Sequence, residues 1–210
     1  MSEQELRDAI VAHAQSLHAR GLSPGTSGNI SARTEGGFLM TPTGSSFGSL
    51  DAARLSFLDE SGRHVHGDPP TKESFLHLAM YEERPDAQAI VHLHSTHAVA
   101  VACMDNRDPE DVLPPLTPYY VMRVGRLPLV RYAAPGDRSL ADAVREGARK
   151  SHALLLANHG PIVAGSSLDA AASAAEEIEE TAKLVLLLRD RDARQLTPDE
   201  VAELRLRFKS

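Results

Sequence analysis

Three histidines lie at the ends of two apolar segments and have the spacing of metal ligands. His92 and His94 close the segment 89–94, and His159 follows the segment 153–157. If 89–94 is a β-strand, residues 92 and 94 point to the same face, because side chains alternate along a strand. Two imidazoles from one strand and a third from another would leave a divalent ion one open position, as in catalytic zinc sites. The spacing therefore predicts a metalloenzyme.

One carboxylate could complete this site. Glu73 stands at the start of a predicted helix over 72–83, for which Thr71 is the expected N-cap. Glu73 could be a fourth metal ligand or a general base. It could equally be an acidic residue that the helix dipole favours in a first turn. The residues alone leave both interpretations open.

Three polar loops could hold a phosphate group. They are Ser27-Gly28-Asn29, Thr43-Gly44-Ser45-Ser46 and Thr71-Lys72. Hydroxyls, an amide, glycine N–H groups and a lysine can together surround a phosphate. None of the loops matches the Walker A pattern or a dinucleotide fingerprint, and each alone is an ordinary turn. Only their combination with a metal site favours a phosphorylated substrate.

Other polar and reactive residues are assigned more ordinary roles. Tyr119 and Tyr120 are candidate proton donors, and we assign the catalytic role to Tyr119 because packing can account for one of the pair. His97 begins a helix beside the metal strand and could support the ligands or merely satisfy that helix start. Cys103 lies among alanines and valines and is expected to be a buried, inert thiol. The remaining histidines are expected at the surface or in packing: His13, His18, His64, His66, His77 and His152.

Composition excludes several classes of protein. The chain has 210 residues, a size that suits a single domain over 1–210. Its net charge is −7 and it has no block of Lys and Arg, so nucleic-acid binding is not expected. No apolar stretch approaches the roughly 20 residues that span a bilayer. With one cysteine and an acidic N-terminus without an apolar segment, we expect a cytoplasmic protein.

The predicted elements favour an α/β protein, in the form of a three-layer α/β/α build around a mixed, largely antiparallel sheet. Strands and helices are mostly joined by short turns. A proline-rich connection over 114–120 is not expected to be regular helix. Helices are predicted over 3–20, 72–83, 95–103, 139–149, 167–188 and 198–208, and strands over 30–33, 38–42, 55–59, 89–94, 127–132, 153–157 and 161–164.

Taken in order, these segments resemble the class II aldolase/adducin family. The resemblance implies the same fold and a zinc ion on His92, His94 and His159, with Glu73 as acid/base; from its position Glu73 is also counted among the candidate metal ligands. It also implies a phosphate site at the three polar loops and a homotetramer with active sites near subunit interfaces. The matching segments are Gly25-Thr26-Ser27-Gly28-Asn29-Ile30-Ser31, Thr41-Pro42-Thr43-Gly44, Lys72-Glu73, His92-Leu93-His94-Ser95 and Leu156-Ala157-Asn158-His159-Gly160.

Within this family, segments 72–81, 91–97 and 116–125 most resemble members that decarboxylate a phosphorylated four-carbon sugar acid. The resemblance implies metal-dependent conversion of 3-oxo-tetronate 4-phosphate to dihydroxyacetone phosphate and CO2 through a zinc-stabilised enediolate. Lys72 stands where aldolases usually have a small hydroxyl residue, and its charge would suit a substrate carboxylate. Two alternatives remain: a class II sugar-phosphate aldolase or 4-epimerase, and a non-catalytic adducin-like binding module.

Overall fold

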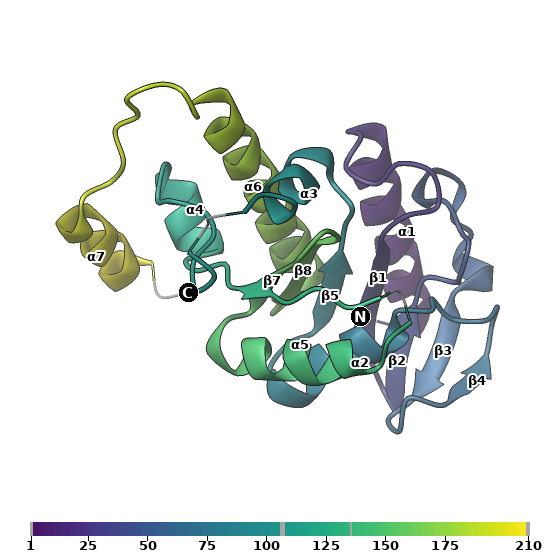
Figure 1. Cartoon of the computed structure of the whole chain (residues 1–210). Helices are drawn as coiled ribbons and strands as arrows, with labels where there is room; N and C mark the ends of the chain where they lie inside the picture. The colour runs from purple at the N-terminus through teal and green to yellow at the C-terminus, as the bar shows by residue number, and fades with distance from the viewer. Residues whose placement is uncertain (1, 106–107, 135, 209–210) are drawn as a thin grey trace.

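A single mixed sheet forms the centre of the computed structural model, which describes residues 2–105, 108–134 and 136–208. Its strand order is β4-β3-β2-β1-β5-β8-β7-β6 (Figure 1). Neighbouring strands are antiparallel except β6 and β7, which are parallel. The strands are β1 Asn29–Thr34, β2 Gly37–Met40, β3 Ser56–Asp59, β4 His64–His66, β5 Ala89–His92, β6 Leu129–Val130, β7 Ala153–Leu156 and β8 Gly160–Gly165.

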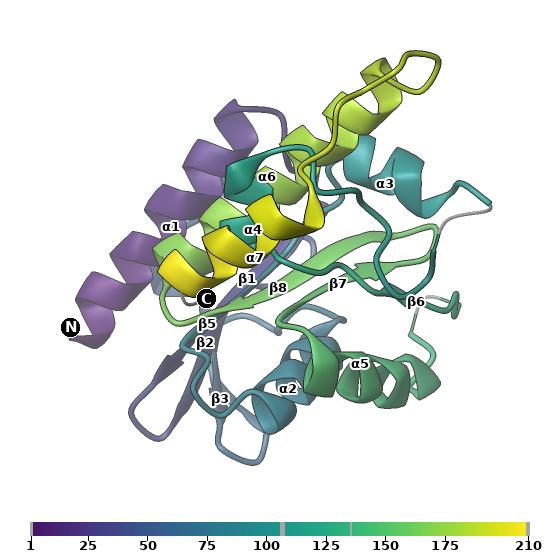
Figure 2. The ribbon, with the colours of Figure 1, turned by 90° about the vertical axis from the view of Figure 1, so that its left-hand side faces the viewer.

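Helices cover both faces of this sheet. Figure 2 shows α1, α3 and α6 on one face and α2 and α5 on the other, with α4 and α7 beyond α6. This arrangement confirms the predicted three-layer α/β/α fold. The helices are α1 Glu3–Ala19, α2 Ser74–Glu83, α3 Thr96–Ala102, α4 Pro118–Arg123, α5 Ser139–Lys150, α6 Leu168–Leu187 and α7 Pro198–Arg207, with 3-10 turns at Phe47–Ser49 and Ala52–Arg54.

Alternation along β5 divides the core and sets the side on which chemistry can occur. Val91 and Leu93 are buried in the apolar cluster under α1, α3 and α6. Ile90 is buried in the second cluster, under α2 and α5. Because neighbouring side chains on a strand point to opposite faces, His92 is directed to the α2 side of the sheet.

Three predicted elements differ from the structure. Helix α4 begins inside the proline-rich segment, with Thr117 as N-cap and Pro118 in its first turn. Proline is tolerated there, because the first N–H groups of a helix have no intrahelical partner. Only Leu129–Val130 of the predicted strand 127–132 pairs with a neighbour, and Pro128, which has no N–H, precedes it. The strand predicted over 89–94 ends at His92.

The start of α2 and the environment of Cys103 also differ from expectation. The helix begins at Ser74, so its N-cap is Glu73 and not Thr71. Cys103 is exposed at the C-cap of α3, where the chain leaves the core, and the prediction of a buried thiol was wrong. Among the described residues, no helix combines the length and apolar character needed to cross a membrane.

Candidate metal centre

The three predicted histidines and Glu73 meet at one point on the α2 side of the sheet. The Nε2 atom of His92 lies 3.0 Å from that of His94 and 3.3 Å from that of His159. The Nε2 atoms of His94 and His159 are 3.1 Å apart. Ligand atoms from all four residues lie within 4.8 Å of one another. Among the described residues, the four therefore form a group that could hold a metal ion.

Strand pairing places His92 and sets its tautomer. His92 is the last residue of β5 and is paired with Asn29 on β1 and with Ile162 on β8. Its Nδ1 lies 2.8 Å from the carbonyl oxygen of Pro161, so Nδ1 carries the proton and donates it. Burial lowers the pKa of His92 to about 3, although Glu73 acts in the opposite direction. The ring is therefore neutral, and its Nε2 lone pair faces the other histidines.

The turn between β7 and β8 brings the third histidine to this point. Asn158 has a φ of 57°, a left-handed conformation that asparagine adopts more readily than most residues. Gly160 has a φ of 151°, and a Cβ there would lie 2.2 Å from the carbonyl oxygen of Leu93. Only glycine allows this approach. The turn can therefore lie against the Leu93-His94 segment and present His159 beside His94.

Glu73 directs its carboxylate to the histidines and not to its own helix. It occupies the N-cap position of α2 without making a side-chain cap hydrogen bond. Its Oε1 lies 2.9 Å from Nε2 of His159, and its Oε2 lies 3.5 Å from Nε2 of His92 and accepts from Asn29 at 2.6 Å. The first-turn explanation of Glu73 therefore does not account for its position.

The charge state of Glu73 suits a cation. Burial alone would raise the pKa of the Glu73 carboxyl. The hydrogen bond with His159, the neighbouring imidazole of His92 and the hydrogen bond from Asn29 outweigh burial and lower this pKa below its ordinary value. Burial, with the neighbouring His159, also lowers the pKa of His94. A carboxylate therefore faces a group in which His92 and His94 favour their neutral form.

These residues fit a divalent metal ion. Tetrahedral zinc with Zn–N distances of about 2.0–2.1 Å would separate its nitrogen ligands by about 3.3 Å. The three Nε2 separations, 3.0, 3.1 and 3.3 Å, are close to that value. Where these nitrogens carry no hydrogen, their lone pairs repel one another, and a cation would remove that repulsion. One carboxylate and three imidazoles are also a usual donor set for catalytic metals.

The predicted phosphate loops lie around a small polar cavity and beside the metal ligands. Thr43 and Gly44 are exposed and line a cavity of about 250 Å³, which also includes Thr26. Gly28 has a φ of 76°, and a Cβ there would lie 3.0 Å from the carbonyl oxygen of His92. The loop that contains Ser27 and Gly28 is therefore packed directly against the end of β5.

The other predicted phosphate residues differ in exposure. Lys72 is exposed, whereas Thr71 is buried and its hydroxyl accepts from the N–H of Glu73 at 3.3 Å. Asn29 is 4% exposed, with its amide between Glu73 and His77. The structure thus joins Asn29 to the carboxylate of the metal group, a contact that its place in a polar loop did not indicate.

Tyr119 and His97 lie outside the group of four. The side chain of Tyr119 is 58% exposed on α4, and its ring lies under the guanidinium of Arg123. The Nδ1 of His97 is 2.7 Å from the carboxylate of Glu179, which also accepts from the N–H groups of His97 and Ala98. Glu179 thereby caps α3, the helix that follows His94. His97 is therefore a histidine whose hydrogen bonds are satisfied at a helix start.

His77 was placed among the packing histidines, and it is fully buried, yet it is linked to the site. Its ring hydrogen-bonds Asn29 on one side and Ser31 on the other, and Ser31 contacts Tyr81. These three residues were not predicted to act as a unit. Their spacing along the chain could have revealed them, because 73, 77 and 81 lie on one face of a helix and 29 and 31 on one face of a strand.

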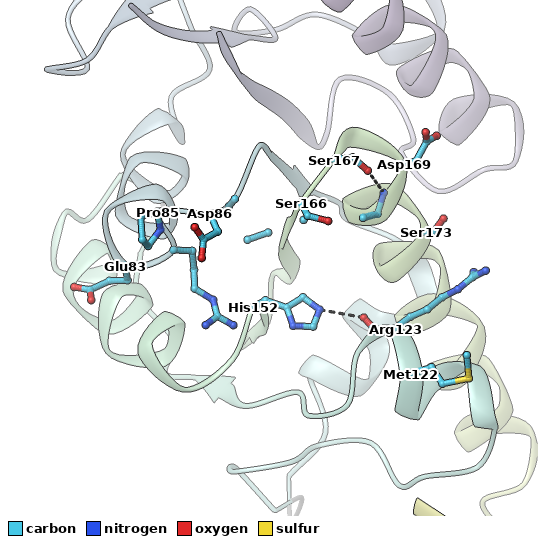
Figure 3. Close-up of a pocket in the computed structure, with 15 residues that line it drawn as sticks. Glu83, Pro85, Asp86, Met122, Arg123, His152, Ser166, Ser167, Asp169 and Ser173 are labelled. Atoms are coloured by element: carbon cyan, nitrogen blue, oxygen red, sulfur yellow. Dashed lines mark hydrogen bonds between the residues drawn. The ribbon is translucent and has the colours of Figure 1, made fainter. Parts of the chain in front are cut away.

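A larger cavity, of about 780 Å³, lies at the other end of strands β5 and β8. Figure 3 shows His152, which hydrogen-bonds the carbonyl oxygen of Arg123, at one side of this cavity, and Ser166 and Ser167 near the start of α6 at another. Its lining mixes cations with the carboxylates of Glu83, Asp86 and Asp169, and it contains none of the four residues of the metal group.

Comparison with known proteins identifies the family. Residues 8–186 match the family described as Class II Aldolase and Adducin N-terminal domain. The chain belongs to this family. The match covers most of the chain and includes each of the four residues of the metal group.

Individual members of the class II aldolase family are similar over nearly the whole chain. The 3-oxo-tetronate 4-phosphate decarboxylase of Escherichia coli O6:H1 is 48% identical over 204 residues, 97% of this chain and 96% of that protein. The L-fuculose phosphate aldolase of Haemophilus influenzae is 35% identical over 191 residues, 90% and 85% of the two chains. The crystal structure of YgbL from Klebsiella pneumoniae has a TM-score of 0.95 at 47% identity, covering 98% of this chain and 100% of that one.

Proposed function

We propose that this protein is a carboxy-lyase that converts 3-oxo-tetronate 4-phosphate to dihydroxyacetone phosphate and CO2. The observation that carries the proposal is the group formed by Glu73, His92, His94 and His159, in a chain 48% identical to a decarboxylase of that name. The aldolase relative is less similar, at 35% identity. The single domain over 1–210, the cytoplasmic location and the homotetramer predicted from the sequence stay predictions.

The four residues of the metal group would hold the electrophile that this reaction needs. We propose that the three histidines and Glu73 hold Zn²⁺. When bound, such an ion acts as a Lewis acid that stabilises the electron pair left on the substrate by the departing CO2. His92 is held in its metal-binding tautomer by the carbonyl of Pro161. The apolar core behind Leu93 supports the strand end from the opposite face.

Glu73 would deliver the proton that the reaction requires. Loss of CO2 breaks the C1–C2 bond and leaves its electron pair delocalised over C2, C3 and the C3 oxygen; protonation at C2 then gives dihydroxyacetone phosphate. Each turnover therefore takes up one proton. The lowered pKa of Glu73 keeps it ionised beforehand, so it would take that proton from solvent water during turnover and then donate it to C2.

The polar loops and two exposed side chains would bind the substrate. We propose that the phosphate lies against Ser27-Gly28-Asn29 and Thr43-Gly44, with Thr71 fixing the start of the Glu73 segment. Lys72 is exposed next to Glu73 and offers a charge to the substrate carboxylate. Tyr119 is exposed on α4 and remains the predicted additional proton donor.

The decisive experiment measures product from purified protein with and without prior chelation. Release of dihydroxyacetone phosphate from 3-oxo-tetronate 4-phosphate, lost on chelation and restored by Zn²⁺, is the expected result. Zinc-loaded protein that leaves this substrate intact but cleaves L-fuculose 1-phosphate would replace the decarboxylase with the aldolase. In D2O, the product should carry one solvent deuterium in a single configuration, because a positioned group delivers the proton to one face.

A further inference from the structure

A line of buried polar side chains runs from Glu73 into the interface between α2 and β1. Asn29 and Tyr81 are each 4% exposed, and His77 and Ser31 are 0% exposed. The hydrogen-bond distances are 2.6 Å from Asn29 to Glu73, 2.5 Å from His77 to Asn29, 2.7 Å from Ser31 to His77 and 3.0 Å from Tyr81 to Ser31. The line is thus continuous from the metal group to the core.

Two regular spacings produce this line. Asn29 and Ser31 are two residues apart on β1 and therefore face the same side. His77 and Tyr81 are four residues apart on α2, and Glu73 stands four residues earlier at its N-cap. The polar stripe of the helix therefore lies along the polar pair of the strand, inside layers that are otherwise apolar.

Only one arrangement of hydrogens satisfies every contact. An ionised Glu73 can only accept, so Asn29 donates with its NH2 group and turns its oxygen to His77. That oxygen can only accept, so His77 donates from Nε2. Burial lowers the pKa of His77 to about 4, so the neutral ring accepts at Nδ1 from Ser31. Ser31 in turn accepts from the hydroxyl of Tyr81. Every donor points towards Glu73.

The orientation of the Asn29 amide depends on this order. An asparagine amide can rotate by half a turn and exchange its oxygen and nitrogen. In that rotated form the Asn29 oxygen would face the Glu73 carboxylate, and two acceptors at 2.6 Å would repel each other. In the observed form the Nε2–H of His77 donates to the Asn29 oxygen and so stabilises that orientation of the amide. In this tautomer the Nδ1 of His77 accepts from the hydroxyl of Ser31, so both ring nitrogens have a partner.

We propose that His77 is a positioning residue that acts through Asn29 to hold the Glu73 carboxylate against the three histidines. The role deepens the proposed function, on which it rests for the metal at this group. His77 itself does not touch the metal group. The line of donors gives the carboxylate one fixed position instead of several rotamers, which favours both metal binding and proton delivery.

The test is a double-mutant cycle on metal affinity, measured by Co²⁺ titration of the full-length, metal-free protein. His77→Phe and Asn29→Ala are each expected to weaken Co²⁺ binding by about 10–100-fold, the usual effect of losing a residue that supports a metal ligand. The double variant should bind within about twofold of Asn29→Ala alone, since His77 acts only through Asn29. His152→Phe, at a half-buried histidine in the other cavity, is the matched control and should bind as wild type does.

Two results would overturn the proposal. One is a His77→Phe protein that binds Co²⁺ as tightly as the His152→Phe control. The other is a double variant whose loss equals the product of the two single losses. If His77→Phe does not fold, Ser31→Ala replaces it, because it removes the hydrogen bond to Nδ1 that holds the His77 ring against Asn29; wild-type Co²⁺ affinity in that variant would equally end the argument.

The cycle separates this proposal from the proposed function. Co²⁺ titration needs no substrate, so a coupled cycle in a protein inactive on 3-oxo-tetronate 4-phosphate supports the role of His77 and rejects the decarboxylase. If the enzyme is active but the losses in Co²⁺ affinity of the two single variants simply multiply in the double variant, the role of His77 is rejected. In an active enzyme His77→Gln, which retains a donor, should recover part of the kcat lost in His77→Phe, while KM for the substrate changes little in either.

Discussion

Replacing Glu73 by glutamine separates proton transfer from the architecture of the site. In the structure Oε2 of Glu73 accepts from Asn29 and Oε1 lies 2.9 Å from Nε2 of His159. A glutamine oxygen can take the first contact, and the side chain has the same length and so still reaches His159. The substitution therefore preserves size and both neighbours, and removes one negative charge and the ability to carry a proton.

The expected loss follows from these two changes. A positioned acid or base contributes about 10²–10⁴-fold to a rate. We therefore expect kcat of Glu73→Gln to fall by that factor, equivalent to about 3–5 kcal/mol of transition-state stabilisation. Three histidines remain, so the variant should still be loaded at a sufficiently high Zn²⁺ concentration. KM should change less than kcat, because the phosphate loops are untouched.

The assay couples dihydroxyacetone phosphate release to NADH oxidation by a dehydrogenase, with metal content measured on the same samples. The matched control is Glu83→Gln at the opposite end of α2, where the carboxylate pairs with Arg149 at 2.9 Å. That variant should turn over as the wild type does. Wild-type turnover by fully metal-loaded Glu73→Gln would refute the role of Glu73 in proton transfer.

Three further predictions concern the turn, the buried histidine and the charge beside the site. Gly160→Ala should cost at least about 1–3 kcal/mol of unfolding free energy and weaken metal binding, because its Cβ would lie 2.2 Å from the Leu93 carbonyl oxygen; urea unfolding and metal titration measure both. The unfolding free energy of the metal-free protein should fall as pH falls from about 6.5 to about 4. In this range the unfolded chain binds a proton at residue 77, whereas the buried ring, with its pKa lowered to about 4, does not. Urea unfolding at several pH values should show that the unfolding free energy of His77→Gln depends less on pH. Lys72→Met should raise KM for the keto acid more than it lowers kcat, and steady-state kinetics with added salt should show a smaller effect of ionic strength than in wild type.

The metal ligands could be predicted because their geometry is local. His92 and His94 need only the alternation of a single extended segment, and His159 needs one turn between two neighbouring strands. The structure brings their Nε2 atoms together even though β5 ends at His92. An extended chain continues the alternation past its last paired residue, so the error in the strand end did not affect the prediction.

Helix starts were predicted less well, because they depend on partners distant in the sequence. Thr71 has the side chain of an N-cap, but the helix begins after Glu73, whose carboxylate is held by Asn29 and His159. In the proline-rich segment, by contrast, local residues determined where the helix begins. Thr117 accepts from the N–H of Tyr120, and Pro118 suits a first helical turn, so local capping outweighed the tendency of prolines to prevent a helix.

The hydrogen-bonded residues behind Glu73 were not predicted, because neither the pair on α2 nor the pair on β1 is unusual alone. A histidine and a tyrosine at 77 and 81 suit one face of an amphipathic helix, and Ser31 suits a strand. Their meaning follows only from the pairing of β1 with β5, which puts Asn29 opposite His92 and turns the polar side of β1 towards α2. Buried polar groups need partners, so a polar stripe at 73, 77 and 81 requires a second polar stripe facing it. The residues 29 and 31, two apart beside the metal strand, are the pair that meets this requirement, and their hydrogen bonds end on the carboxylate that the metal group needs.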